Sequence, residues 1–470
     1  MSIPLHQVGL RATTDAVPPH SEPSSSSYKQ HINLYSLSIL TKQKVILGDL
    51  DVSALHHVID PGHIHANRLA SSYSSLYFIN HKKLYKINYE LPKSENILWR
   101  PTKNTKLPYP IPLADINIQV IYDAGKSDFQ DIEIHKNRIG VCDDMGNVYI
   151  FDNQHDDNHD DDDTQDKTHS KKKRKIDESS IIQLSYDSPS SSEMHIRGHS
   201  SVKFHPTDDS IIIRSKFENK NVTIYDVNRN SAIFNIHTMQ NPTKLKPFII
   251  EQSNTPLLAI GEYNNVSIWD FRSNKVVNRL TRTRGIVYDM EVTSSGSNGK
   301  HKSSNLLGVV GSDRTVYVYD TLKWSPIHKW QNCLKYAPSY LSFSNVNKEL
   351  CYVAGFDNSE FKCGNFVDQK QQRHGRGHGL YADHRWIGMT KPLNAFSSGD
   401  GSGGSDGQSE FNSMMTTTAN DTIVGMSMNG TLYVIEHPYK MAPMSGLQQS
   451  DHDDDLTDRE AIRDDDLMDD

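Results

Sequence analysis

The chain has 470 residues, of which 36% are hydrophobic, and it carries a formal net charge of −8 at pH 7. No stretch approaches the roughly 20 consecutive apolar residues needed to cross a bilayer, and the amino terminus lacks the charged-then-apolar order of a secretory signal. We therefore expect a soluble intracellular protein. The four cysteines form no CxxC pair, which argues against a disulfide framework and against a structural zinc site.

The net negative charge of the chain comes from two blocks. Residues 451–470 contain 11 acidic residues and two arginines, so residues 1–450 carry a net charge of +1. Residues 153–178 contain nine acidic and six basic residues. Such dense runs of charge lack apolar anchors, and we expect both blocks to be disordered.

Low-complexity sequence sets the expected domain boundaries. Residues 1–29 are expected to form a disordered amino-terminal segment, and residues 437–470 a disordered acidic tail. Between them, residues 30–436 are expected to form a single all-β domain. Disordered insertions are predicted within this domain at 153–195, 294–304 and 397–419.

A short pattern recurs along this domain. It consists of a small or polar residue, a β-branched residue or Leu, alternating apolar positions, and a final Asp or a substitute for it. The copies, in chain order, are KLYKIN at 83–88, NVYIFD at 147–152, NVTIYD at 221–226, NVSIWD at 265–270, TVYVYD at 315–320, EFKCGN at 360–365 and TLYVIE at 431–436.

Each copy predicts a strand, because apolar and polar residues alternate with period two and Val, Ile and Tyr are frequent. Several copies follow another alternating segment across a turn of Asn, Asp or Gly, as in RIGVCDDMGNVYIFD at 138–152, which predicts hairpins. Successive copies from Asp226 to Asn365 are spaced by 44, 50 and 45 residues. This spacing is typical of a four-stranded propeller blade.

At this point the sequence resembles the WD-repeat family of β-propellers. The most specific stretch, residues 198–226, begins with the pair Gly198–His199 and ends in Tyr225–Asp226. The copy NVSIWD supplies a Trp-Asp pair. The resemblance implies an all-β fold, a single seven-bladed propeller of four-stranded antiparallel blades.

The resemblance also implies roles for particular residues. The repeat aspartates are expected to be structural, with hydrogen bonds inside their own blades; they are Asp152, Asp226, Asp270 and Asp320. The family closes its ring by pairing the two ends of the chain. Residues 31–40 form an isolated alternating segment, and we expect them to complete the last sheet.

The sequence contains no recognised catalytic or cofactor-binding motif. The nearest metal-like group is Cys363, His374, His378 and His384. Its irregular spacing and missing second Cys favour a solvated loop at a blade edge instead. We therefore expect a protein that is not an enzyme and binds neither cofactor nor metal.

The run KKKRK is the sharpest short motif, and it resembles a monopartite nuclear localisation signal that an import receptor binds. Its residues are Lys171, Lys172, Lys173, Arg174 and Lys175. A solvated charge run is the alternative. We expect the protein in the nucleus, with or without a cytoplasmic pool. Direct nucleic-acid binding is not expected, because the acidic flank of this run would repel phosphate.

The segment Trp269–Asp270–Phe271–Arg272 resembles the WD-x-R ending through which WD-repeat substrate receptors dock onto the adaptor of cullin-type ubiquitin ligases. An arginine can satisfy several acceptors at such a contact. Trp269 and Asp270 occur in any WD repeat, however, so Arg272 carries nearly all of the additional information. An exposed arginine without a partner is the alternative.

These patterns lead to a main functional hypothesis and two alternatives. The main hypothesis is a non-catalytic scaffold for protein–protein interaction in a nuclear complex. The first alternative is a substrate receptor of a cullin-type ligase. The second is a chaperone or adaptor for basic nuclear proteins that uses the acidic tail, although such a tail also serves solubility alone.

Overall fold

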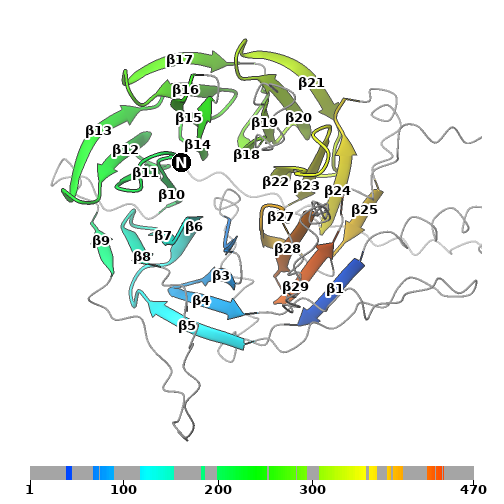
Figure 1. The fold of residues 1–470 in the computed structure, drawn as a ribbon, viewed down its shortest axis with the longest axis horizontal. Coiled ribbons are helices and arrows are strands. Elements are labelled where there is room, and N and C mark those ends of the chain that lie inside the picture. The colour runs from blue at the N-terminus through cyan, green and yellow to red at the C-terminus, as the bar shows by residue number, and fades with distance from the viewer. Residues whose placement is uncertain are drawn as a thin grey trace, which may run out of the picture.

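The fold was taken from a computed structural model. It describes residues 39–44 by their backbone, and residues 67–72, 75–88, 117–152, 181–185, 198–250, 253–281, 283–293, 306–355, 359–367, 378–382, 385–394, 421–428, 430–436 and 438. All regular elements of five or more residues in these ranges are strands. They form seven antiparallel sheets arranged in a closed ring around a central channel (Figure 1). The expected seven-bladed, all-β propeller is confirmed.

The first four blades are four-stranded sheets whose strands are adjacent in chain order. Blade 1 contains β2 (Leu69–Ser71), β3 (Ser75–Asn80), β4 (Lys83–Asn88) and β5 (Asn117–Asp123). Blade 2 contains β6 (Phe129–His135), β7 (Arg138–Asp143), β8 (Val148–Asp152) and β9 (Ile182–Leu184). Blade 3 contains β10 (Ser200–Phe204), β11 (Ile211–Lys216), β12 (Asn221–Asp226) and β13 (Ser231–His237). Blade 4 contains β14 (Lys244–Ile250), β15 (Thr255–Gly261), β16 (Val266–Asp270) and β17 (Lys275–Leu280).

The remaining blades complete the ring. Blade 5 contains β18 (Val287–Val292), β19 (Leu306–Gly311), β20 (Thr315–Asp320) and β21 (Ser325–Gln331). Blade 6 contains β22 (Pro338–Phe343), β23 (Leu350–Gly355), β24 (Glu360–Asn365) and β25 (His378–Tyr381). Blade 7 contains β26 (Trp386–Met389), β27 (Leu393–Asn394), β28 (Asp421–Ser427), β29 (Thr431–Glu436) and β1 (Ile39–Lys44). In blade 7, β26 and β27 both pair with β28, so the innermost strand of this blade is interrupted.

Each of the seven repeat copies found in the sequence lies in the third strand of its blade. These strands are β4, β8, β12, β16, β20, β24 and β29. The second strand of each blade is also flanked on both sides, so position alone does not distinguish the third strand. The third strand was visible as a repeat because its apolar residues are followed by Asp, Asn or Glu in all seven copies.

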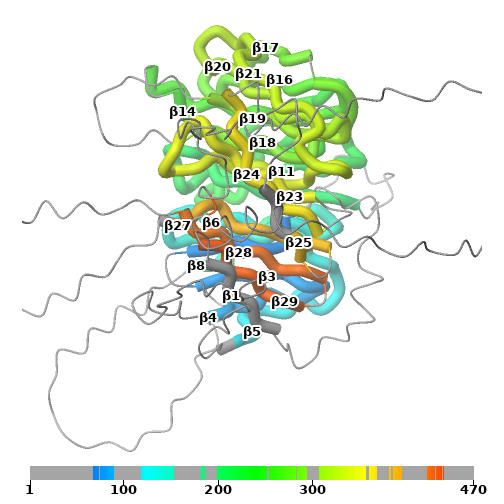
Figure 2. The backbone as a smooth tube through the Cα atoms, turned by 90° about the vertical axis from the view of Figure 1, so that its right-hand side faces the viewer, coloured from blue at the N-terminus to red at the C-terminus, as the bar shows by residue number. Residues whose placement is uncertain are grey.

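The ring closes through the expected pairing of chain ends, in a strand that overlaps the predicted segment and extends beyond it. β1 pairs antiparallel with β29, from Ile39 opposite Glu436 to Lys44 opposite Thr431. The two strands lie side by side in Figure 1. Figure 2 shows β28 and β29 of blade 7, in orange, next to β3 of blade 1, in blue. The prediction for residues 31–40 is confirmed at Ile39 and Leu40, and the pairing continues to Lys44, which was not predicted because residues 41–44 are all polar. Residues 31–38 lie outside the described residues.

A second boundary also needs correction. The expected insertion at 153–195 contains β9, whose residues Ile182 and Leu184 lie opposite Ile150 and Val148 of β8. This strand is only three residues long and lies between polar stretches, so the composition of the segment did not indicate it. The predicted disordered segments at 1–29, 294–304 and 397–419 lie outside the described residues, and the tail does so except for Pro438.

The core is divided into seven apolar clusters, one at each junction between neighbouring blades. At the closing junction, for example, Leu69 and Phe78 of blade 1 pack with Val424 and Leu432 of blade 7. A small sheet cannot bury both of its faces alone, and the ring supplies a neighbour for each face. In the described part of the chain there is no helix long and apolar enough to span a membrane.

Candidate interaction surfaces

The antiparallel order of each blade sorts its loops onto two faces of the ring. Loops between second and third strands share one face with the loops that connect one blade to the next. Backbone bonds join these loops, as from Asn264 N–H to the Gly285 carbonyl (2.8 Å). We name this side the Tyr263 face. The opposite side carries the remaining loops, and we name it the Arg272 face.

The Tyr263 face has a hollow of about 200 Å³ where blades 3 and 4 meet. Tyr263 and Met239 lie beside it on loops and are 54% and 60% exposed. The hollow is lined by Phe217, Gln240, Asn241, Thr243, Tyr263 and Ile286. Large side chains this exposed, next to a hollow, are typical of protein-binding surfaces.

A buried carboxylate holds these loops in place. Glu262 is 0% exposed, and its Oε2 accepts the backbone N–H of Gln240 (2.7 Å). Its Oε1 accepts the hydroxyl of Ser267 (2.7 Å) and the amide of Asn265 (3.3 Å). The exposed tips are thus carried by loops that are already ordered, which lowers the entropy cost of binding.

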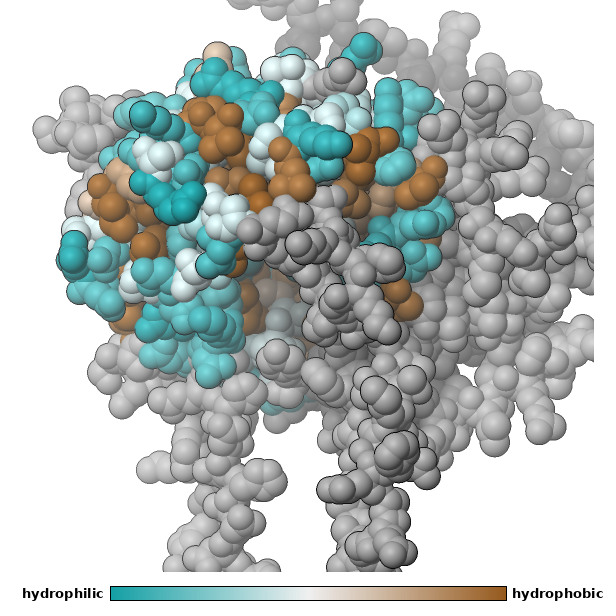
Figure 3. Space-filling model, turned by 45° about the horizontal axis from the view of Figure 1, so that its top comes forward, coloured by the Kyte–Doolittle hydropathy of each residue, from teal (hydrophilic) through white to brown (hydrophobic). Residues whose placement is uncertain are grey.

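A larger groove of about 710 Å³ lies at the outer edge of blade 5. Arg284, from the loop between blades 4 and 5, and Lys329, from β21, line it together with Tyr317. The Lys329 ammonium lies 5.6 Å from the centre of the Tyr317 ring. The edge of the ring near β17 and β21, turned toward the viewer in Figure 3, shows hydrophobic patches separated by polar residues.

On the Arg272 face, the ligase-docking motif spans the end of β16, which holds Trp269 and Asp270, and the turn to β17, which holds Phe271 and Arg272. Trp269 and Phe271 are half-buried against the core between blades 3 and 4. The Phe271 ring meets that of His205 edge-on, with 4.4 Å between centres. Arg272 projects from the turn with its side chain 63% exposed, while one guanidinium nitrogen donates to the Thr255 hydroxyl (3.1 Å).

Three of the repeat aspartates cap the turn that follows their strand. Asp226 Oδ1 accepts the backbone N–H of Asn228 (2.9 Å), and Asp270 Oδ1 accepts that of Arg272 (2.9 Å). Asp320 Oδ1 accepts the N–H of Leu322 (2.7 Å). Aspartate is suited to this position because its short carboxylate reaches a backbone donor two residues ahead.

The other repeat residues have different surroundings. Asp152 does not cap a described turn and instead lies 3.3 Å from the Arg138 guanidinium. Gly198 donates its N–H to the Asp144 carbonyl (3.0 Å), which ties the start of blade 3 to a loop of blade 2. His199 is buried, and its carbonyl accepts the Phe217 N–H (3.0 Å).

The Cys363 group does not have the setting expected from the sequence. Cys363 is not in a solvated loop: it is fully buried in β24, opposite the backbone of His378 in β25. His374, His384 and the side chain of His378 lie outside the described residues. Within the described ranges, no three His, Cys, Asp or Glu residues are grouped as metal ligands.

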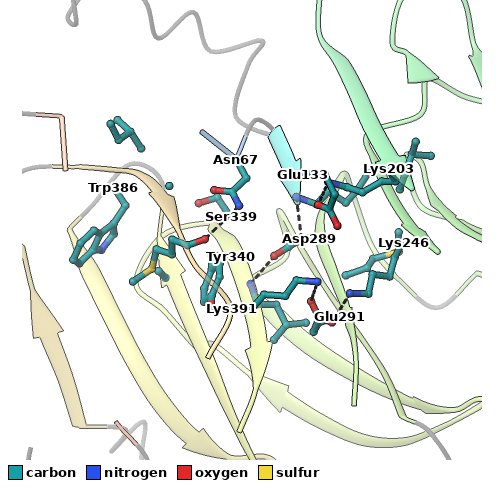
Figure 4. A pocket seen from close by; sticks show the side chains of 18 of the residues that line it. Asn67, Glu133, Lys203, Lys246, Asp289, Glu291, Ser339, Tyr340, Trp386 and Lys391 are labelled. Atoms are coloured by element: carbon teal, nitrogen blue, oxygen red, sulfur yellow. Dashed lines mark hydrogen bonds and ion pairs between the residues drawn. The ribbon is translucent and has the colours of Figure 1, made fainter. Parts of the chain in front are cut away.

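The central channel is lined by charged residues of the innermost strands, and it encloses a cavity of about 90 Å³ (Figure 4). Lysines from blades 3 and 4 face acids on the neighbouring blades. The pairs join Lys203 to Asp131 (3.3 Å) and Glu133 (2.7 Å), Lys244 to Asp289 (3.1 Å), and Lys246 to Glu291.

Glu291 also holds a second lysine, Lys391 of blade 7, at 3.1 Å. Burial alone would raise the pKa of Glu291, but attraction from Lys246 and Lys391 outweighs it and lowers this pKa to about 2. Burial, aided by the like charge of Lys391, lowers the pKa of Lys246 to about 8. The three residues bridge blades 4, 5 and 7 across the channel.

Sequence reasoning missed the channel and the Tyr263 face. The channel did leave a signal, since Lys244-x-Lys246 and Asp289-x-Glu291 have the period-two spacing that puts both charges on one side of a strand. Met239 and Tyr263 left none, because loop residues follow no periodicity. The basic run 171–175 and the tail segment 451–470 lie outside the described residues.

No protein-family model matches the chain, and no curated protein matches it in sequence. Among solved structures, the chain is similar to one described as "Crystal Structure of Mitotic Checkpoint Complex". The TM-score is 0.51 at 10% identity, covering 91% of this chain and 98% of that one. The WD40 β-propeller domain of Doa1 is also similar, with a TM-score of 0.48 and 9% identity over 82% of this chain and 96% of that one.

The seven blades, the repeat in every third strand and the closure by both chain ends define the class of protein. The fold is a WD40-type β-propeller, as the sequence resemblance implied. Propellers of this type generally serve as scaffolds for protein interaction.

Proposed function

We propose that this chain is a non-catalytic scaffold that binds a protein partner through the Tyr263 face, with Met239 and Tyr263 as anchors. The observation that carries the proposal is the exposure of these two large side chains beside the hollow between blades 3 and 4. Aromatic residues and methionine are enriched at interfaces, where a few such anchors dominate the binding energy.

The hydrogen bonds that hold the loops carrying these anchors favour the same function. Glu262 and the bond between Asn264 and Gly285 fix the loops before any partner arrives. A rigid platform loses little entropy on binding, so a small number of side chains suffices for a stable contact.

A photo-crosslinking amino acid at position 263 tests the proposal. We expect it to capture a discrete partner, and the captured protein, once purified, to bind the native chain and to bind Tyr263→Ala at least tenfold more weakly. The matched position is Leu322, which is 48% exposed on the Arg272 face. Capture of the same partner from position 322 and not from 263 would refute the assignment of the face.

The nuclear setting is part of the proposal and rests on residues 171–175. A reporter fused to residues 153–180 is expected to enter the nucleus, and the same fusion with these five cations replaced by alanine is expected to stay outside. A reporter that remains cytoplasmic with the native segment would remove this part of the proposal.

Docking to the adaptor of a cullin-type ligase is a second candidate, which the exposure of Arg272 favours. Its guanidinium donates one described hydrogen bond, to Thr255, and its Nε lies 3.6 Å from Asp270 Oδ1, so the remaining N–H groups are available. Arg229 is the matched control because it lies in the equivalent turn of blade 3 and is 82% exposed. Arg272→Ala is expected to lose adaptor co-purification while Arg229→Ala retains it, and equal retention by both would exclude this candidate.

A further inference from the structure

The groove at the outer edge of blade 5 has a positive lining that is not neutralised. Arg284 and Lys329 lie in the groove, and the exposed Arg314 and Lys335 lie on the adjacent loops. Among the described residues, none of these four cations has a carboxylate within 4 Å, whereas the channel lysines all do.

The acid that lines the groove is already engaged. Asp313 Oδ2 accepts the hydroxyl of Tyr317 (2.7 Å), and its Oδ1 accepts the backbone N–H of Thr315 (3.3 Å). The Arg314 guanidinium donates to the Lys335 carbonyl (2.8 Å), which fixes the adjacent loops against each other. Among the residues that line this cavity of about 710 Å³, two are cations and one is an acid, so the lining carries a net charge of +1.

An extended acidic polypeptide fits this groove chemically. Its carboxylates would pair with Arg284 and Lys329, and its aliphatic side chains would pack on Ile327, which lines the groove and is 43% exposed. The acidic run at residues 451–470 of this same chain has that chemistry, with 11 acids, two arginines and interspersed Leu and Ile residues.

A short linker joins the acidic run to the described part of the chain. The described part ends at Pro438, and residues 439–450 separate it from the acidic run. A dozen residues can span up to roughly 45 Å when extended. A tethered segment also has an effective concentration in the millimolar range, so a weak contact suffices for occupancy.

We propose that residues 451–470 dock in the groove formed by Arg284, Tyr317 and Lys329 and cover it in the intact protein. This assignment is independent of the partner site at Tyr263. It gives the acidic segment a binding role within its own molecule, in place of solubility or the binding of basic proteins.

Fluorescence anisotropy with a labelled peptide of residues 451–470 tests the proposal. The protein used is the chain ending at residue 450, which retains every described residue. We expect the peptide to bind this protein, and to bind Arg284→Glu/Lys329→Glu at least tenfold more weakly. Binding should also disappear near 0.5 M salt, where charges are screened over a few ångströms.

Three controls make the result decisive. Lys275→Glu/Lys323→Glu carries the same charge change at exposed positions on the Arg272 side of blades 4 and 5, and it should bind the peptide within twofold of the native protein. A peptide with its acids replaced by Asn and Gln should not bind. The intact chain should bind added peptide at least fivefold more weakly than the truncated chain, because its own segment competes.

The proposal is overturned if the two double variants weaken binding equally, since the effect would then be general electrostatics. It is also overturned if intact and truncated chains bind the peptide equally well. Groove-dependent binding of a single-stranded oligonucleotide, with no binding of the peptide, would assign the groove to nucleic acid instead.

Discussion

The channel wall and the Tyr263 side of the ring use charge in opposite ways. In the channel every lysine faces a carboxylate of the same molecule, as Lys246 faces Glu291. Beside the Tyr263 face, Arg284 and Lys329 have no carboxylate partner in the described residues. The comparison shows that pairing, rather than the number of charged residues, separates the side chains that hold the ring together from those available for binding.

The largest effect is expected from removing the strand that closes the ring. Deletion of residues 1–45 removes β1 and leaves the edge of β29 unpaired, so the junction of blades 7 and 1 and the channel wall beside it lose support. We expect loss of a large fraction of the ~5–15 kcal/mol that stabilises a typical domain, measured by denaturant unfolding. Deletion of residues 1–29, which retains β1, is the control, and equal midpoints for both deletions would contradict the closure.

The second-largest loss of stability is expected from breaking the ion-pair network of the channel. Glu291→Gln leaves Lys246 and Lys391 without their shared counter-charge inside the channel. We expect a loss of about 3–5 kcal/mol in the free energy of unfolding, as for other buried ion pairs deprived of one member. Partner binding at Tyr263 should be unchanged below the unfolding transition. A loss under about 1 kcal/mol would mean that the pairing does not hold the ring together.

The same network predicts that the free energy of unfolding decreases at acid pH. The pKa of Glu291 is lowered from 4.5 to about 2, so its contribution is present above about pH 4.5 and is lost as pH falls toward 2. The shift corresponds to up to about 3 kcal/mol. Glu133, whose pKa is also lowered, adds to the effect in the same direction. Native protein should therefore lose more stability than Glu291→Gln over this window, and parallel pH profiles would refute the assignment.

A smaller effect is expected at the capped turns of the Arg272 face. Asp270→Ala removes the acceptor for the Arg272 N–H and should cost about 1 kcal/mol, the usual value of one such hydrogen bond. Asp152→Ala removes only a half-exposed ion pair with Arg138 and should cost less than about 0.5 kcal/mol. Thermal unfolding of both variants measures the difference. A larger loss in Asp152→Ala than in Asp270→Ala would refute the capping role of Asp270.

The smallest effect on stability is expected in the basic groove. Arg284→Glu/Lys329→Glu should change the free energy of unfolding by less than about 0.5 kcal/mol, because neither cation is paired inside the described part of the molecule. A loss above 1 kcal/mol in urea denaturation would place these residues with the channel lysines, and the contrast between the two regions would fail.

The sequence predicted the fold because the short apolar run of each third strand ends in Asp, Asn or Glu, which made the repeat recognisable. β9 and the end of β1 escaped prediction because three residues are too few to show a period and because residues 41–44 are all polar. The turn with Arg272 was visible because it follows a repeat strand. Tyr263 was not, since its exposure depends on how blades 3 and 4 meet.

The central claim is that the Tyr263 face binds the partner, and one measurement tests it most directly. The dissociation constant for the crosslinked partner would be compared between Met239→Ala/Tyr263→Ala and Leu322→Ala/Val346→Ala, which removes two exposed apolar side chains from the Arg272 face. We predict that the first variant weakens binding at least 30-fold with an unchanged unfolding temperature, and that the second binds as the native protein does. Native affinity in the first variant, or an equal loss in both, would contradict the account.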